Sequence, residues 1–425
     1  MMAMKVFKFG GASVKNAESV RNVASILKMY EESTIVVIIS AMGKMTNAFE
    51  GIWKSALLRD KTAKEQLQAV QEFHGQIISE LFEETPRSLA SQLEAIYNEL
   101  EDRIKNPITA KPNYFYDQIV SNGEIISTLI VSAYLQHIGV SNRWIDARKL
   151  VKTDYNYREA KVDWNKTRAQ IKAELLPYFE SGESRIAVSQ GFIGGADHLN
   201  TTTLGREGSD YSAAIFAYSL DAEQVSIWKD VPGVLNADPR QYPNAELLSN
   251  ISYKEAVELA YYGASVIHPK TIQPLQNKNI PLWVKSFVEP EKSGTLIDNN
   301  TAADSLIPSF IVKQNQRLIS IATRDFAFIV EDNLSDIFHH FANHGVKINI
   351  MQNSAINFSV GVDEDEQKLE GLLNDLSNQY EVRYNTPLDL VTIRHFTPEI
   401  VDELTKNRNI IVEQRTRNTV RFLIR

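Results

Sequence analysis

A lysine and two glycines near the start of the chain form a candidate phosphate site. The segment KFGGAS, residues 8–13, follows an apolar run typical of a strand, and a helix is expected to begin near Asn16. Paired glycines let the backbone approach an oxyanion closely, a helix N-terminus adds partial positive charge, and Lys8 adds a full charge. A tight strand-to-helix turn with a solvated lysine is the alternative interpretation, because short glycine motifs are weak evidence.

A second segment combines a cation with a helix start. TTLGREGSDYSAA, residues 202–214, is a polar, glycine-containing loop that leads into an apolar helix predicted over residues 211–220. Ser209 or Asp210 could cap that helix, which leaves Arg206 free for a bidentate contact with a carboxylate or phosphate. Capping alone does not explain the arginine, the glycines and the threonine run that precede it, so we favour a functional loop.

A third segment follows a predicted strand. WKDVPGVLNADPR, residues 228–240, places a Pro-Gly turn just beyond the strand end. Ligands of open α/β sheets gather at the carboxyl ends of strands, where Asp230 and Arg240 are expected to project. An ordinary surface loop is the alternative.

Three shorter segments place small residues and a few polar groups at element boundaries, as binding loops do. They are ISAMGKMTN (residues 39–47), SNGE (residues 121–124) and GASVIHPKT (residues 263–271). His268 could shuttle a proton, but a histidine before proline more often begins a helix or packs, so we do not interpret it as a base.

The composition bounds the class of protein. The chain has 425 residues, 43% of them hydrophobic and 23% charged, which is typical of a folded globular protein with two or three domains. The net charge of −8 gives no general attraction to nucleic acid or anionic membranes, and the lack of cysteine excludes disulfides and thiolate chemistry. We find no signal peptide and no apolar run of membrane-spanning length, and we therefore expect a cytoplasmic protein.

The known nucleotide and hydrolase motifs are missing from the sequence. It has no Walker loop, no protein-kinase motif set, no H-E-x-x-H, no G-x-S-x-G and no G-x-G-x-x-G. A phosphate-handling enzyme with this sequence must therefore use another nucleotide fold.

The chain is organised in two parts. Residues 5–294 alternate β-branched runs with amphipathic stretches, which predicts an α/β domain with a mostly parallel sheet, and residues 47–105 are mostly helical. After the turn-rich residues 298–308 the sequence changes to short predicted strands with short helices between them. Two stretches of the tail, beginning near residues 334 and 398, each predict helix, strand, turn and strand, which indicates a duplicated α+β unit.

Taken in order, these motifs resemble the aspartate kinase branch of the amino acid kinase family, and the tail resembles the paired ACT regulatory modules that follow the kinase domain there. The resemblance implies an open, mostly parallel sheet sandwiched by helices in a catalytic domain over residues 1–297. It also implies ferredoxin-like α+β modules over residues 308–425, with the second unit shortened. The implied reaction transfers the γ-phosphoryl of ATP, carried with Mg²⁺, to the side-chain carboxylate of L-aspartate, on the route to lysine, threonine and methionine.

The resemblance also implies roles for individual residues. Lys8 would neutralise charge on the transferring phosphoryl and Asp210 would orient the transition state, with no general base because the acceptor is already ionised. The implied substrate-binding residues are Thr46, Glu124, Arg206, Gly208 and Ser209. The implied nucleotide-binding residues are Gly10, Gly11, Ser13, Lys229, Asp230, Leu235, Arg240, Ser265 and Val266. No metal site made of protein side chains is expected.

Several residues depart from the commoner family pattern. Ser265 stands where lysine is frequent, Leu235 where tyrosine is frequent, and Glu207 where glycine is frequent. In the tail, Asp332, Asn333 and Asn349 replace frequent glycine or acidic residues. The departures at Ser265, Leu235 and Glu207 keep open a catalytically weak homologue that senses amino acids or assembles subunits. A kinase for another small acid, such as an acylated glutamate, is a separate alternative. From the resemblance we also expect a homodimer or larger homo-oligomer associated through the tail, and lysine or threonine as an effector.

Overall fold

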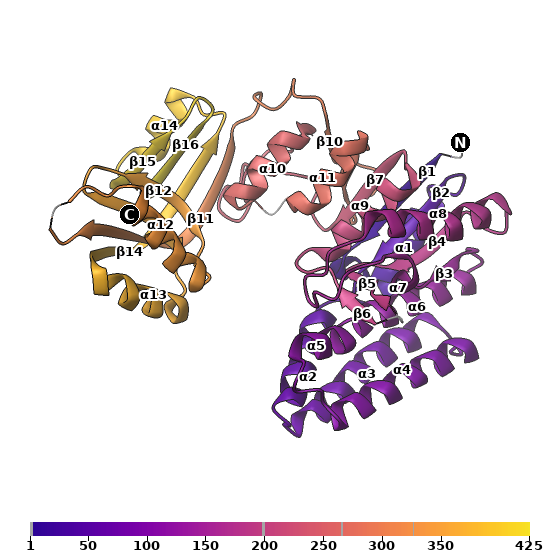
Figure 1. Ribbon diagram of the computed structural model, residues 1–425. Coiled ribbons are helices and arrows are strands. Elements are labelled where there is room, and N and C mark those ends of the chain that lie inside the picture. Colours follow the sequence, from indigo (N-terminus) through magenta and orange to yellow (C-terminus); the bar gives the residue numbers. More distant parts are fainter. Residues whose placement is uncertain (1–2, 198–199, 265–266, 326) are drawn as a thin grey trace. The chain divides into compact units, whose positions relative to one another are not determined.

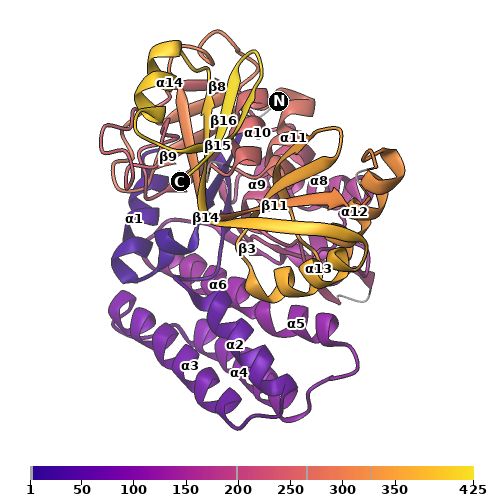
Figure 2. The same ribbon diagram turned by 90° about the vertical axis from the view of Figure 1, so that its left-hand side faces the viewer.

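The structure is a computed structural model that describes residues 3–197, 200–264, 267–325 and 327–425 (Figures 1 and 2). Residue contacts divide the chain into two compact units. The first holds residues 1–234, 247–257 and 266–301, and the second holds residues 235–246, 258–265 and 302–425. Two short internal segments therefore group with the tail. The sequence analysis expects one domain boundary between residues 297 and 308, and this boundary stays a prediction.

The first unit contains the predicted mostly parallel sheet. Its strand order in the described residues is β3-β4-β2-β1-β7-β9-β10-β8, and β10 runs antiparallel to β9. The strands are β1 (Met4–Phe9), β2 (Thr34–Ile39), β3 (Arg143–Ile145), β4 (Ile186–Gln190), β7 (Gln224–Lys229), β8 (Asn250–Ser252), β9 (Leu282–Ser286) and β10 (Thr295–Asp298). A separate hairpin pairs β5 (Ile193–Gly195) with β6 (Thr201–Thr203).

The central strands are apolar because both faces of the sheet are covered. β2 has the sequence TIVVII, and all of its residues are buried, as expected for a parallel strand between helical layers. α6 (Asn122–His137) packs on β2, β3 and β4, and α9 (Gly208–Leu220) packs on β1, β2 and β7. The fold class expected from the sequence is confirmed.

The remaining helices of this unit follow the predicted pattern. Asn16 caps α1 (Ala17–Lys28) by accepting a hydrogen bond from the backbone N–H of Ser19 at 2.9 Å. The helix-rich stretch becomes α2 (Met45–Leu57), α3 (Thr62–Leu81), α4 (Arg87–Lys105) and α5 (Pro112–Val120), which lie together at one end of the unit (Figures 1 and 2). The others are η1 (Gly11–Val14), α7 (Ala147–Leu150), α8 (Trp164–Glu180) and α11 (Pro269–Lys278), together with the first half of α10 (Tyr253–Tyr262), whose residues from 258 onward group with the second unit. No helix in the described part of the chain combines the length and the apolar character that a membrane span requires.

The tail forms one antiparallel sheet with the order β12-β13-β11-β14-β16-β15. Its strands are β11 (Ser309–Thr323), β12 (Ile348–Asn353), β13 (Asn357–Asp363), β14 (Tyr380–Arg394), β15 (Ile410–Arg415) and β16 (Thr419–Ile424), and its helices are α12 (Glu331–Asn343), α13 (Glu366–Gln379) and α14 (Pro398–Thr405). The predicted duplication is present as α12-β12-β13 and α14-β15-β16. The long strands β11 and β14 join the two copies into a single sheet.

Candidate active site

One cavity of about 750 Å³ in the first unit collects the predicted acceptor residues. It lies where β1 and β2 end and where α9 begins, so it occupies the carboxyl edge of the parallel sheet. Its walls include all of the following predicted residues: Lys8, Thr46, Glu124, Arg206, Gly208, Ser209 and Asp210. Segments that are far apart in the sequence therefore meet at one site.

A buried ion pair forms part of the cavity wall. Lys8 Nζ, from β1, lies 2.7 Å from Asp210 Oδ1, from the first turn of α9, and both side chains are nearly inaccessible to solvent. Burial alone would raise the pKa of Asp210, but the charges of Lys8 and Lys229 hold it below its usual value. The pair thus places a fixed ammonium and a fixed carboxylate side by side in the cavity.

The loop before α9 differs from one expectation. Neither Ser209 nor Asp210 caps the helix, because α9 begins at Gly208 and its N-cap is Glu207, which makes no side-chain capping bond and has a left-handed φ of 54°. The capping interpretation is therefore wrong for both residues, and their side chains belong to the cavity wall instead. Among the described residues, the guanidinium of Arg206 has no hydrogen bond or ion pair, so its donors are available to a ligand.

Glu124 is the buried carboxyl group of the site. Its Oε1 accepts a hydrogen bond from the backbone N–H of Ala41 at 3.3 Å, whereas its Oε2 is buried without a partner among the described residues. Burial raises the pKa of Glu124 to about 8, and the bond from Ala41 and the charge of Lys8 only partly oppose this rise. A buried acceptor without a donor calls for a cation or donor from a ligand.

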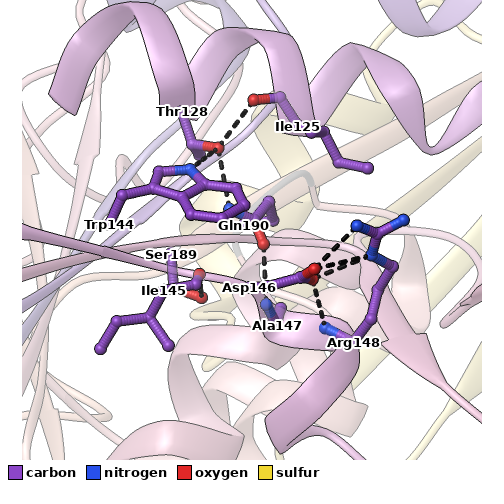
Figure 3. Close-up of polar contacts among 9 residues, drawn as sticks. All are labelled: Ile125, Thr128, Trp144, Ile145, Asp146, Ala147, Arg148, Ser189 and Gln190. Carbon is purple, nitrogen blue, oxygen red and sulfur yellow. Dashed lines mark hydrogen bonds and ion pairs between the residues drawn. The ribbon is translucent and has the colours of Figure 1, made fainter. Parts of the chain in front are cut away.

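A polar network fixes the helix that carries Glu124. One turn further along α6, the Thr128 hydroxyl donates to the Glu124 carbonyl at 2.9 Å and accepts from Trp144 Nε1 and Gln190 Nε2, both at 2.9 Å. Gln190 in turn accepts from the Ala147 backbone N–H at 2.7 Å. Figure 3 shows these side chains converging from α6, β3, β4 and the start of α7, so α6 is tied to the sheet beside the cavity.

The glycine turn after β1 is shaped by close backbone packing. A Cβ on Gly11 would lie 2.6 Å from the carbonyl oxygen of Gly43 and 2.9 Å from that of Ala41, so only glycine fits there. Gly43 N–H also donates to the Gly11 carbonyl at 3.0 Å. Ser13 is buried and donates to the Trp228 carbonyl at 3.4 Å. These contacts explain the turn without a ligand, and the phosphate-binding role of Gly10, Gly11 and Ser13 stays a prediction.

The structure does not bring the other predicted nucleotide-binding residues that it describes together at one site. Lys229 ends β7 and Asp230 follows it in the first unit, whereas Leu235 and Arg240 belong to the second unit. Arg240 makes an exposed bidentate pair with Asp238, with its NH2 group 2.7 Å from Oδ2. Ser265 and Val266 lie outside the described residues.

Three residues at or beside the cavity were not predicted from the sequence. Arg158 and Tyr116 line the same cavity, and Asp117, beside Tyr116 in α5, is fully buried. The only signal for Asp117 was a charged residue inside the apolar run YFYDQIV, which usually means that the charge is satisfied by partners. Arg158 carried no such signal.

An open, mostly parallel sheet with helices on both faces and a charged cavity at its carboxyl edge is the framework of a small-molecule-binding α/β domain. The chain belongs to the amino acid kinase family, whose sequence profile matches residues 3–286. It is 29% identical to the lysine-sensitive aspartokinase 3 of Escherichia coli over 400 residues, which is 92% of this chain and 87% of that protein.

Solved structures agree with this assignment. E. coli aspartokinase III in complex with lysine and aspartate (T-state) superposes with a TM-score of 0.84 at 28% identity, covering 99% of this chain and 95% of that one. The same enzyme in complex with aspartate and ADP (R-state) gives a TM-score of 0.82 at 27% identity, with 99% and 96% coverage.

Proposed function

We propose that this protein transfers the γ-phosphoryl of ATP to the side-chain carboxylate of L-aspartate and so forms 4-phospho-L-aspartate, the first step toward lysine, threonine and methionine. The observation that carries the proposal is a pairing in one cavity, beside the Lys8–Asp210 pair: the Arg206 guanidinium and one buried oxygen of Glu124 both lack a partner among the described residues. Such a site suits a small molecule with a carboxylate, an ammonium group and a second, reacting acid. The complexes of E. coli aspartokinase III with aspartate and ADP support this choice.

In this mechanism the acceptor is held by charge. Arg206 binds the α-carboxylate bidentately, Glu124 and Thr46 hold the ammonium group, and Gly208 and Ser209 allow the ligand to approach the start of α9. The acceptor carboxylate then points toward Lys8. Because a carboxylate is already a nucleophile, the protein needs to position it and does not need a general base.

Lys8 and Asp210 act on the transferring group. The buried ammonium of Lys8 stabilises negative charge that develops on the phosphoryl oxygens, which is more effective in a water-poor site than in bulk water. Asp210 fixes the position of that ammonium through their ion pair. We propose that the nucleotide phosphates contact Gly10, Gly11, Ser13, Lys229 and Asp230, and that the nucleotide loop includes Leu235, Arg240, Ser265 and Val266.

Magnesium is proposed to arrive with the nucleotide. The described residues contain no cluster of three or more acidic or histidine side chains that could hold a metal ion, and in this proposal the ion would be held mainly by the nucleotide. Bound there, Mg²⁺ supplies neutralisation of phosphate charge.

The tail is proposed to regulate and assemble the enzyme. Because the related E. coli enzyme is lysine-sensitive and binds lysine in its T-state, we propose that lysine or threonine binds the tail and that the tails associate in a homodimer or larger assembly. The cytoplasmic location stays a prediction.

A coupled ADP-release assay tests the catalytic proposal. Aspartate, glutamate and N-acetylglutamate are compared at saturating Mg-ATP, with a hydroxylamine trap that detects the acyl phosphate. We expect turnover with aspartate alone. Turnover with another acid would instead identify that acid as the substrate, and no turnover with any acid would support the catalytically weak homologue.

A further inference from the structure

Arg158 adopts a backbone conformation that arginine rarely uses. Its φ is 73°, in the left-handed region, where a side chain is strained and where an outlier points to a function. Its backbone N–H is held by the carboxylate of Asp117, at 3.1 Å from Oδ2 and 3.2 Å from Oδ1. The conformation is therefore imposed by a specific buried partner.

The same carboxylate ties Arg158 to the strand that leads to Arg206. Asp117 also accepts from the backbone N–H of Thr203 at 2.9 Å and from its hydroxyl at 2.8 Å. A Cβ built on Gly205, the residue before Arg206, would lie 3.3 Å from the Arg158 carbonyl oxygen. The two arginines therefore stand on adjacent, fixed pieces of backbone and line one cavity.

The guanidinium of Arg158 is oriented but has unused donors. Its central carbon lies 4.3 Å from the ring centroid of Tyr116 and 5.5 Å from that of Trp53, so the flat face of the group is occupied. Stacking of this kind leaves the N–H groups in the plane of the guanidinium available. Among the described residues that side chain has no hydrogen bond or ion pair, and the nearby carboxylate of Glu50 accepts from the Tyr116 hydroxyl instead.

We infer that Arg158 is a second carboxylate-binding residue of the acceptor site, which joins Arg206 in binding the non-reacting α-carboxylate and so selects α-amino dicarboxylic acids. This inference rests on the proposed function. The assignment to the non-reacting carboxylate follows from placement: Arg158 is fixed beside the loop of Arg206, whereas the reacting carboxylate faces Lys8 on β1. The stacking of the Arg158 guanidinium on Tyr116, in the cavity that Arg206 also lines, favours a binding role over a merely structural one.

The test uses Arg158→Gly, which removes the side chain and also relieves the left-handed backbone. We expect the aspartate KM to rise by about 10- to 100-fold, as for loss of hydrogen bonds to a charged group, while kcat and the KM for ATP change less than about twofold. The aspartate KM of Arg158→Lys should fall between those of the wild type and of Arg158→Gly, because an ammonium keeps the charge but not the planar guanidinium. The matched control is Arg59→Gly, since Arg59 is likewise an exposed, left-handed arginine, with φ 55°, but does not line the cavity.

A specificity measurement separates substrate binding from a structural effect. The wild type and Arg158→Gly are each compared on aspartate and on its α-amide, and we expect the preference for aspartate in kcat/KM to shrink by at least fivefold in the variant. An unchanged preference and an unchanged aspartate KM would overturn the inference. If the wild type itself failed to phosphorylate aspartate, the proposed function would fail first, and this result is visible in the same assay. Should Arg158→Gly not fold, Arg158→Lys provides the same comparison.

Discussion

Glu124 should lose a proton when the acceptor binds. The free enzyme buries this carboxyl group in the cavity with a pKa of about 8, and one of its oxygens has no partner in the part of the chain that the structure describes. An ammonium group placed against that oxygen favours the carboxylate and lowers its pKa. Binding of aspartate at neutral pH is therefore expected to release a proton.

The size and sign of the effect follow from that pKa. With a pKa of about 8, roughly nine in ten free molecules carry the proton at pH 7, so binding should release about 0.9 proton per site. Because the protonated form must be ionised before the ammonium group binds well, raising the pH from 6 to 8 should lower the apparent Kd for aspartate by about 50-fold. Above about pH 9 the dependence on Glu124 should disappear, because nearly all of the free enzyme is then ionised.

Calorimetry in buffers of different ionisation enthalpy measures the proton directly. The slope of binding enthalpy against buffer enthalpy should correspond to release of about 0.9 proton at pH 7 for the wild type, and to nearly none for Glu124→Gln. Glu159→Gln is the control, since Glu159 lines the same cavity but is exposed. A wild-type slope near zero, or a Kd that does not vary between pH 6 and 8, would refute the reasoning.

Further predictions concern the ion pair, the guanidinium, the buried loop anchor and the tail. Lys8→Ala should remain folded by circular dichroism but lose about 10²- to 10³-fold in kcat, with incomplete rescue by arginine; near-normal turnover would contradict its role. Arg206→Ala should raise the KM for aspartate far more than that for ATP in steady-state kinetics, and the reverse would mean that the loops serve the opposite ligands. Burial raises the pKa of Asp117 to about 6. Protonated Asp117 therefore makes its full contribution to the free energy of unfolding below about pH 4, and this contribution is lost as the pH rises through about 6. Denaturant melts should therefore show a wild-type loss of about 3 kcal/mol over that range, absent in Asp117→Asn. Millimolar lysine or threonine should bind the tail and inhibit the kinase reaction, and no heat and no inhibition in titrations would leave the tail as an assembly device.

The sequence predicted the elements that depend on continuous or periodic apolar residues. The run TIVVII of β2 and the cap at Asn16 were recognisable because their signals are local. Short strands such as β3, β6 and β8 were missed, because three-residue strands are held by their neighbours more than by their own residues.

The site could be predicted only as far as its motifs reach. Lys8, Arg206 and Asp210 occur in recognisable segments, yet the ion pair between Lys8 and Asp210 joins residues far apart in the sequence and has no local signal. Arg158 and Asp117 are separated by 41 residues and meet through a single backbone N–H. Local sequence patterns do not predict long-range contacts of this kind.

The two halves of the tail share strands and so form one continuous sheet. β11 and β14 pair along most of their length, and a seam between the halves is filled by Leu318, Ile350, Leu388, Leu390, Val412 and Leu423. At this seam a Cβ on Gly361 would lie 2.6 Å from Ile350 and 3.1 Å from Leu423, so the halves interlock without spare volume. Because the two halves share these strands and this packed seam, we expect a displacement of one half to move the other with it, so that an effector bound to either half acts on the whole tail.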